Sequence, residues 1–292
     1  MTRARLLCGA LALATLAGCS ALKLSYNRLD WIANWQIGRF VDLAPPQQAL
    51  FEQRFQDVWQ WHRGTQLELY VRDLRELAAT LERPLGAPRV EEYLDRSQDH
   101  LGRLLQELVP DTARVLQTFD EEQTAELVGK LAKRRRERAE ESEGMTAEEL
   151  RADAEERMIR NIKRWIGAPN REQKARIRRW ANERAYAGSI WQQYQEAWAA
   201  AFTEVLAHRR DAGFEARLSA LFDNARVPYG EEMAKVQAHN RHAWIGVMAD
   251  LSAMLTPEQR RHLQARLREF AADLEELARQ RQQQAAAPGS IG

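Results

Sequence analysis

The stretch Leu255–Leu277, which reads LTPEQRRHLQARLREFAADLEEL, indicates the fold class of the whole chain. Thr256 stands three positions before Gln259, which is the spacing of a capping box, a pair of side chains that bond the first backbone amides of a helix. Pro257 takes the first helical position, where its missing amide hydrogen is no loss. The apolar residues that follow share one helical face: Leu263, Leu267, Phe270, Leu274 and Leu277. The stretch therefore predicts a capped amphipathic helix.

The same capping arrangement recurs along the chain. It is complete at residues 120–123, 146–149 and 170–173, and residues 44–47 form a degenerate copy that lacks the cap oxygen. Ala, Leu, Glu, Arg and Gln, which favour helices, dominate between the boxes, whereas Val, Ile and Thr are scattered. The irregular intervals between the boxes do not fit a solenoid of fixed period. The sequence therefore predicts an all-α protein, an elongated bundle of long amphipathic helices.

Proline and glycine mark the expected ends of these helices. Pro45-Pro46 opens a long helix that reaches about Arg83. Further breaks are expected at residues 84–88, Pro110, 142–144, 167–169, Gly213 and Pro228. The sequence thus predicts one helical domain over residues 26–280, followed by a frayed tail over residues 281–292 that is rich in Gln and Ala.

Residues 120–165 stand out by their charge. They carry 13 acidic and 11 basic side chains, with the densest basic cluster at Lys133–Arg138. A segment so charged is mostly solvated, and we expect a helical pair that protrudes as an arm. Arg134, Arg135 and Arg136 are candidate contacts for anionic lipid phosphates or peptidoglycan, although a plain solvated face is the alternative. The whole chain has a net charge of +1, which gives no field to attract nucleic acid.

The first residues have the pattern of a secretory signal. Arg3 and Arg5 precede an apolar run over residues 6–17, and a helix of that length spans about 18 Å, too little for a bilayer core of about 30 Å. The mean hydropathy of −0.59 also excludes a membrane protein with many spans. Residues 1–18 are therefore expected to be a signal peptide, and residues 19–25 a lipid anchor with a short linker.

Leu16-Ala17-Gly18-Cys19 resembles the lipobox of bacterial lipoproteins. The resemblance implies cleavage between Gly18 and Cys19, a diacylglycerol thioether on Cys19 and an acyl chain on its new amino group. Anchors with more than one chain hold a protein stably to a membrane. Ser20 follows where an Asp would favour the inner membrane in Gram-negative sorting, so the resemblance implies the outer membrane, with the body in the periplasm. Beyond these lipids we expect no cofactor.

Three further motifs carry a resemblance to a family. They are Tyr26–Trp31, Val41–Leu43 and Leu255–Gln259. Together with the highly charged middle of the chain they are similar to an uncharacterised family of proteobacterial lipoproteins defined by a domain of unknown function, DUF 6279. That family has no established activity, so the resemblance implies a location rather than a mechanism. Leu255–Gln259 also resembles the Leu-Thr-x-x-Gln motif of periplasmic chaperones of the Spy and CpxP type, which implies a helical cradle for unfolded clients.

Two sets of tryptophans are candidate contact residues. Trp31 and Trp35 lie four apart on one helical face, close behind Cys19, and their rings either pack in the core or contact the membrane interface. Asn27, Arg28 and Asp30 beside them are expected to pair with another helix or to cap this one. A second stripe forms either a core face or a groove for client peptides: Trp191, Trp198, Phe202 and Val205.

No pattern in the sequence points to catalysis. His239 and His242 can share one helical face but lack a third ligand, so we expect no metal site. There is no nucleophile elbow, no zinc-protease motif and no phosphate-binding glycine loop. We therefore expect a non-enzymatic structural or partner-binding component of the cell envelope, whose partners are the membrane and an envelope protein. A chaperone for unfolded clients is the first alternative and an enzyme the second; the sequence leaves the oligomeric state open.

Overall fold

The computed structural model describes residues 22–222 and 230–286, and these residues form helices and no strand, which confirms the all-α prediction. A short helical stretch at residues 22–26 precedes the first labelled helix. The helices are α2 (Leu29–Gly38), α3 (Pro45–Trp61), the π-helix η1 (His62–Gln66), α4 (Leu67–Thr80), α5 (Ala87–Gln117), α6 (Glu121–Glu143), α7 (Ala147–Ile166), α8 (Arg171–Glu183), α9 (Gly188–Ala207), α10 (Phe214–Phe222), α11 (Gly230–Ala253) and α12 (Pro257–Ala286). Within the described ranges, none of them is long and apolar enough to cross a bilayer.

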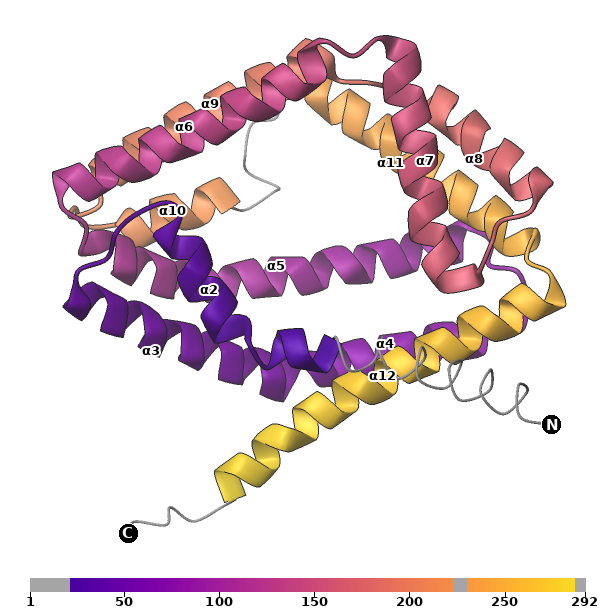
Figure 1. The fold of residues 1–292 in the computed structure, drawn as a ribbon, viewed down its shortest axis with the longest axis horizontal. Helices are drawn as coiled ribbons and strands as arrows, with labels where there is room; N and C mark the ends of the chain where they lie inside the picture. The colour runs from indigo at the N-terminus through magenta and orange to yellow at the C-terminus, as the bar shows by residue number, and fades with distance from the viewer. Residues whose placement is uncertain (1–21, 223–229, 287–292) are drawn as a thin grey trace, which may run out of the picture.

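The helices form a flat, closed frame (Figure 1). One side is the rod of α3, η1 and α4, with α12 packed on α4 and α5 running back against α3. A second side is the pair of α6 and α9, and a third consists of α7, α8 and α11. The short helix α10 packs on α5 and on α9, and α2 crosses α3. The helices therefore pack in small groups that meet at corners.

Capping boxes start helices at the predicted places. The Gln259 amide donates to Thr256 Oγ1 over 3.1 Å, and the Thr256 amide donates to Gln259 Oε1 over 3.2 Å. The same reciprocal bonds close the boxes at 120–123, 146–149 and 170–173. In the degenerate copy only the returning bond forms, from the Ala44 amide to Gln47 Oε1. These bonds satisfy amides that the first turn of a helix leaves without partners.

The glutamines of the capping boxes also bond to one another, in two pairs. Gln173 and Gln259 exchange amide hydrogen bonds of 2.8 and 3.1 Å, and Gln47 and Gln123 exchange bonds of 2.9 and 2.7 Å. Each of these four amides donates in addition to a backbone carbonyl in the chain just before its partner's helix. The two pairs thus tie the start of α8 to that of α12 and the start of α3 to that of α6.

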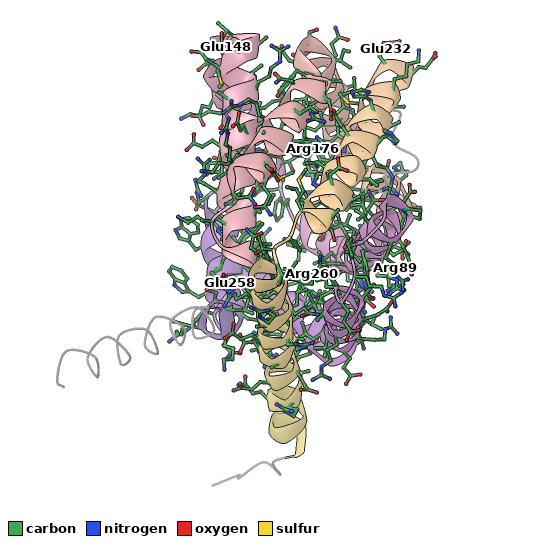
Figure 2. All side chains as sticks on the ribbon, turned by 90° about the vertical axis from the view of Figure 1, so that its right-hand side faces the viewer. Arg89, Glu148, Arg176, Glu232, Glu258 and Arg260 are labelled. Carbon is green, nitrogen blue, oxygen red and sulfur yellow. The ribbon has the colours of Figure 1, made fainter. Side chains whose placement is uncertain are left out.

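The apolar core is divided among the corners. The largest cluster joins α5, α6, α9 and α10, a second joins α7, α8 and α11, and a third joins α4, α12 and Tyr26. Buried arginines hold these clusters together: Arg209 donates to the Phe119 carbonyl, and Arg176 donates to Asp250 over 2.6 Å. Figure 2 shows Arg176 between α8 and α11.

Several predicted boundaries need correction. Pro110 does not end a helix but lies inside α5, where the burial of Val109 and Ala113 outweighs the lost backbone bond. The long rod from Pro45 ends at Thr80 and contains a π turn that the sequence did not reveal. The breaks at 142–144 and 167–169 are confirmed, and Pro228 lies outside the described residues.

The charged segment 120–165 does not form the protruding helical pair that the sequence predicted. It comprises α6 and α7, but α6 lies along α9 and α7 lies along α8, so each helix belongs to a side of the frame (Figure 1). Its apolar residues Leu127, Ala154 and Met158 are buried in two different clusters. The first part of the expected frayed tail, residues 281–286, belongs to α12, which continues to Ala286. Residues 287–292 lie outside the described residues.

Candidate functional site

A groove of about 770 Å³ lies between α6 and α9. Its lining is mainly apolar and aromatic and includes Phe40, Val128, Leu131, Trp191, Trp198 and Phe202. Trp198 stacks on Phe202 with a centroid distance of 5.3 Å, and its indole nitrogen donates to the Leu221 carbonyl. Phe202 is buried, whereas Trp191 is 46% exposed. The predicted stripe of α9 therefore packs in the core at Trp198, Phe202 and Val205 and also lines the groove from Trp191 to Phe202.

The two helices that form this groove line it with side chains of opposite charge. Arg134, Arg135 and Arg138 of α6 line one side, and Glu196 and Glu204 of α9 line the other. The guanidinium of Arg134 lies 4.1 Å from the centre of the Phe40 ring, in a cation–π contact.

The cluster Arg134–Arg136 is divided by the groove. Among the described residues, no ion pair joins Arg134, Arg135 or Arg136 to a carboxylate. Arg136 is exposed and does not line the groove, so only two of these three candidates belong to it. On the other rim, Glu204 lies 3.2 Å from His208.

The N-terminal segment carries a second exposed surface. Trp31 and Trp35 stack almost parallel, with centroids 6.5 Å apart, and they are 63% and 52% exposed. Leu24 nearby is 64% exposed. The core-packing interpretation of Trp31 and Trp35 is therefore wrong, because α3 lies against another side of α2, at Asp30 and Asn34. Arg28 is exposed beside Trp31, where both line a shallow hollow with Leu24.

The segment before α2 is held to the body by a set of polar contacts at the π-helix. The Tyr26 hydroxyl lies 2.9 Å from His62 Nδ1, and Arg63 donates to Asn27 Oδ1 over 2.6 Å. Lys23 bonds Glu276 of α12 over 2.7 Å. Arg63 is 2% exposed and lies over the Trp59 ring. We call these contacts of Lys23, Tyr26 and Asn27 the N-terminal clamp.

The clamp assigns a role to the motif Tyr26–Trp31. Tyr26 and Asn27 bind the π-helix. Among the described residues, Arg28 and Asp30 form no ion pair with each other or with a neighbouring helix. Asp30 instead faces α3, where it lines a hollow with Asn34 and Glu52. Of the three polar residues that the sequence singled out in this motif, Asn27 bonds another helix, whereas Arg28 and Asp30 do not. Nothing in the sequence marked the π turn that binds Asn27.

Burial lowers the pKa of His62 below its usual value. His62 is therefore neutral in the folded protein over a pH range in which the unfolded chain already binds a proton. Because the unfolded state takes up more protons there, the free energy of unfolding should fall as the pH drops below the ordinary His range. We expect this loss in acid titrations of stability, and we expect His62→Gln to flatten it; an unchanged slope in that variant would contradict this role of His62.

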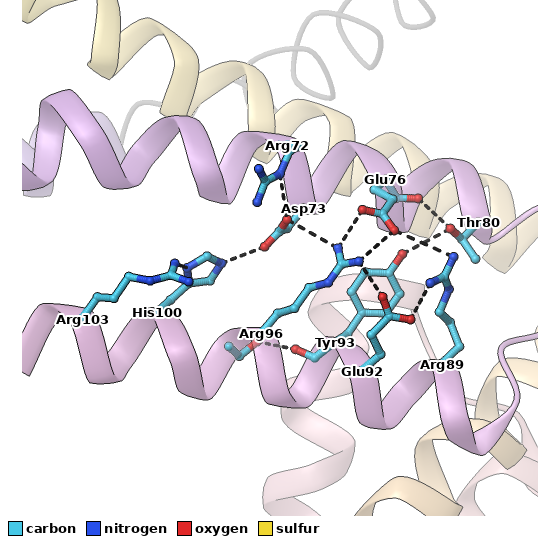
Figure 3. Close-up of polar contacts among 11 residues, drawn as sticks. Arg72, Asp73, Glu76, Thr80, Arg89, Glu92, Tyr93, Arg96, His100 and Arg103 are labelled. Carbon is cyan, nitrogen blue, oxygen red and sulfur yellow. Dashed lines mark hydrogen bonds and ion pairs between the residues drawn. The ribbon is translucent and has the colours of Figure 1, made fainter. Parts of the chain in front are cut away.

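The polar residues between α4 and α5 form an ion-pair network (Figure 3). Arg96 bonds Glu76 at 2.7 and 3.3 Å, and His100 Nε2 lies 2.7 Å from Asp73. The bonds to Glu76 raise the pKa of Arg96 above its usual value. Because Arg96 of α5 pairs with the carboxylates of both Asp73 and Glu76, this network joins α5 to α4. The described residues contain no group of three His, Cys, Asp or Glu side chains that could hold a metal ion.

Comparisons with known proteins place the chain in a family whose function is unknown. No curated protein and no solved structure matches it. Of the features that suggested the family, Val41–Leu43 and the highly charged middle of the chain lie inside the matched segment, whereas Tyr26–Trp31 and Leu255–Gln259 lie outside it. The family model described as "Family of unknown function (DUF6279)" matches residues 39–233, more than half of the chain, and the chain therefore belongs to this family.

Proposed function

We propose that this protein is a lipid-anchored component of the outer membrane, facing the periplasm, that binds a helical partner of the cell envelope without catalysis. The anchor is Cys19, exposed by cleavage after Gly18; both residues lie outside the described part of the structure, and the lipobox supports this step. The observation that carries the binding role is the groove between α6 and α9.

The groove has the chemistry of a helix-binding surface. An amphipathic helix laid between α6 and α9 would bury its apolar stripe against Trp191, Trp198 and Leu131 and keep its other face in water. The charged rims of the groove determine which residues of the partner fit on either side of its apolar stripe, because arginines line the α6 side and glutamates line the α9 side. A partner with acidic residues toward α6 and basic residues toward α9 is therefore complementary in charge.

Site-specific photo-crosslinking in intact cells tests this role. Ala200 lines the groove, whereas Ala197, on the same helix and equally exposed, does not. A photoreactive residue at position 200 is expected to give a discrete crosslinked product that is absent at position 197. Exchanging Arg134 and Arg135 for glutamate should reduce that product severalfold.

Two other results would contradict the proposal in different ways. Equal products at positions 200 and 197, or products with bulk lipid only, would show that the groove does not select a partner. A broad range of products that increases when proteins unfold would favour the chaperone alternative, because an unfolded client has no fixed pattern of charged flanks.

A further inference from the structure

Three large apolar side chains remain exposed on the first described residues. Leu24, Trp31 and Trp35 are each more than half exposed, although buried positions for side chains of this size exist elsewhere in the frame. They belong to the same short segment, and the side of α2 that lies against α3 carries Asp30 and Asn34 rather than the two rings. An apolar surface of this kind on a folded protein marks a contact that lies outside the chain itself.

The position of this surface in the chain identifies the contact. Cys19 precedes Leu22, the first described residue, by three residues, so it lies within about 11 Å of it. If Cys19 carries acyl chains in a bilayer, residues 22–39 begin at the surface of that bilayer. Trp rings favour this interfacial layer, where an apolar ring and a polar nitrogen are both accommodated.

The N-terminal clamp prevents the body from moving away on a tether. Lys23 is fixed to α12, and Tyr26 and Asn27 are fixed to the π-helix. Tyr26 is also buried against α4 and α12 in the core. A lipidated Cys19 is therefore joined to the frame by two undescribed residues rather than by a long flexible linker.

The charges of residues 22–39 suit a phospholipid surface. The segment contains the bases Lys23, Arg28 and Arg39 and a single acid, Asp30. Arg28 lines the hollow beside Trp31, and the Arg39 guanidinium lies 4.8 Å from the centre of the Trp35 ring. Asp30 faces α3, so the exposed charges beside the rings are positive and can contact lipid phosphates.

We propose that residues 22–39 form a membrane-docking platform, in which Leu24, Trp31 and Trp35 enter the headgroup layer of the same leaflet that holds the acyl chains of Cys19. The occupant of this surface is a phospholipid bilayer. The platform fixes the orientation of the whole frame on the membrane and keeps the groove between α6 and α9 at a constant angle to it. This inference rests on the lipid anchor of the proposed function.

The experiment uses the absence of other thiols in the mature lipoprotein. Cys8 lies before the cleavage site and Cys19 is acylated, so a new cysteine is the only free thiol. A nitroxide label is attached to Leu24→Cys in the lipidated protein, reconstituted in vesicles of phosphatidylethanolamine and phosphatidylglycerol. Ala197→Cys on α9 provides an exposed reference position. Oxygen enters the bilayer and a water-soluble nickel complex does not, so their relative effects on the label report its depth.

We expect oxygen to be the stronger enhancer of spin relaxation for the label at position 24. The nickel complex should be the stronger enhancer for the label at position 197. Exchanging Trp31 and Trp35 for serine should make the label at position 24 severalfold more accessible to the nickel complex relative to oxygen. Trp244→Ser, which removes an exposed ring on α11 outside the groove, should leave the depth of the label unchanged and serves as the matched control.

The experiment distinguishes failure of the membrane-docking platform from failure of the lipid anchor. If the protein stays on the vesicles but the label at position 24 is as accessible to the nickel complex as that at position 197, the platform is wrong and the anchor stands. The platform is also wrong if serine at positions 31 and 35 has no effect on depth. If a Cys19→Ala variant binds the vesicles as well as the native protein, the anchor of the proposed function is wrong.

Discussion

Replacing Gln173 with leucine is expected to lower the free energy of unfolding by about 3 kcal/mol, because it leaves several buried polar groups without partners. Gln173 has no exposed surface, and its amide bonds Gln259 and the Met254 carbonyl. Its side-chain oxygen also accepts the Asn170 amide that starts α8. Urea denaturation followed by circular dichroism measures the change.

Two controls separate this prediction from a general loss of packing. Gln47→Leu changes the corresponding pair at the start of α3, where Gln47 is half-buried, and it should cost about 1 kcal/mol because water replaces the lost bonds. In the double variant Gln173→Leu/Gln259→Leu the two effects should not add, since each single change already breaks the shared bonds. Full additivity would contradict the paired arrangement.

Replacing Arg209 with methionine is expected to lower the free energy of unfolding by about 3 kcal/mol. Arg209 is 1% exposed and donates to the Phe119 carbonyl over 2.9 Å. It also lies 2.6 Å from Glu121 in the first turn of α6. Methionine fills similar space but leaves the Phe119 carbonyl unpaired in the largest apolar cluster. Thermal unfolding with fluorescence detection of the tryptophans measures the loss.

The neighbouring residue provides the control for Arg209. Arg210 has the same side chain and is exposed, so Arg210→Met should change stability by less than about 0.5 kcal/mol. Glu121 is 82% exposed, and Glu121→Gln should also have a small effect. If Arg209→Met were as mild as Arg210→Met, the backbone carbonyl of Phe119 would not depend on Arg209.

The starts of the helices could be predicted from the sequence because a capping box is a local arrangement of four residues. The pairing of these starts could not be predicted, since Gln173 and Gln259 are separated by 86 residues and only packing brings them together. Pro110 shows the opposite case, in which a local signal predicted a break and the burial of its neighbours prevailed. The charged helices α6 and α7 were assigned to an arm because nothing local showed which helices would cover them.

The candidate surfaces were predictable only in part for the same reason. Spacing placed Trp31 and Trp35 on one face of a helix, but exposure depends on which face α3 covers. Arg134, Arg135 and Arg136 point in three directions around α6, and the position of α9 decides which of them line the groove. The π turn at His62–Gln66, which receives Tyr26 and Asn27, left no mark in the sequence.

The proposed location and the membrane-docking platform both depend on Cys19, so the most direct test is the mass of the native N-terminus. The protein is extracted from outer membranes, digested and measured by mass spectrometry. We predict an N-terminal peptide that begins at Cys19 and carries the masses of a diacylglycerol thioether and one further acyl chain. A mature chain that begins at any other residue, or a Cys19 with an unmodified thiol, would contradict the account.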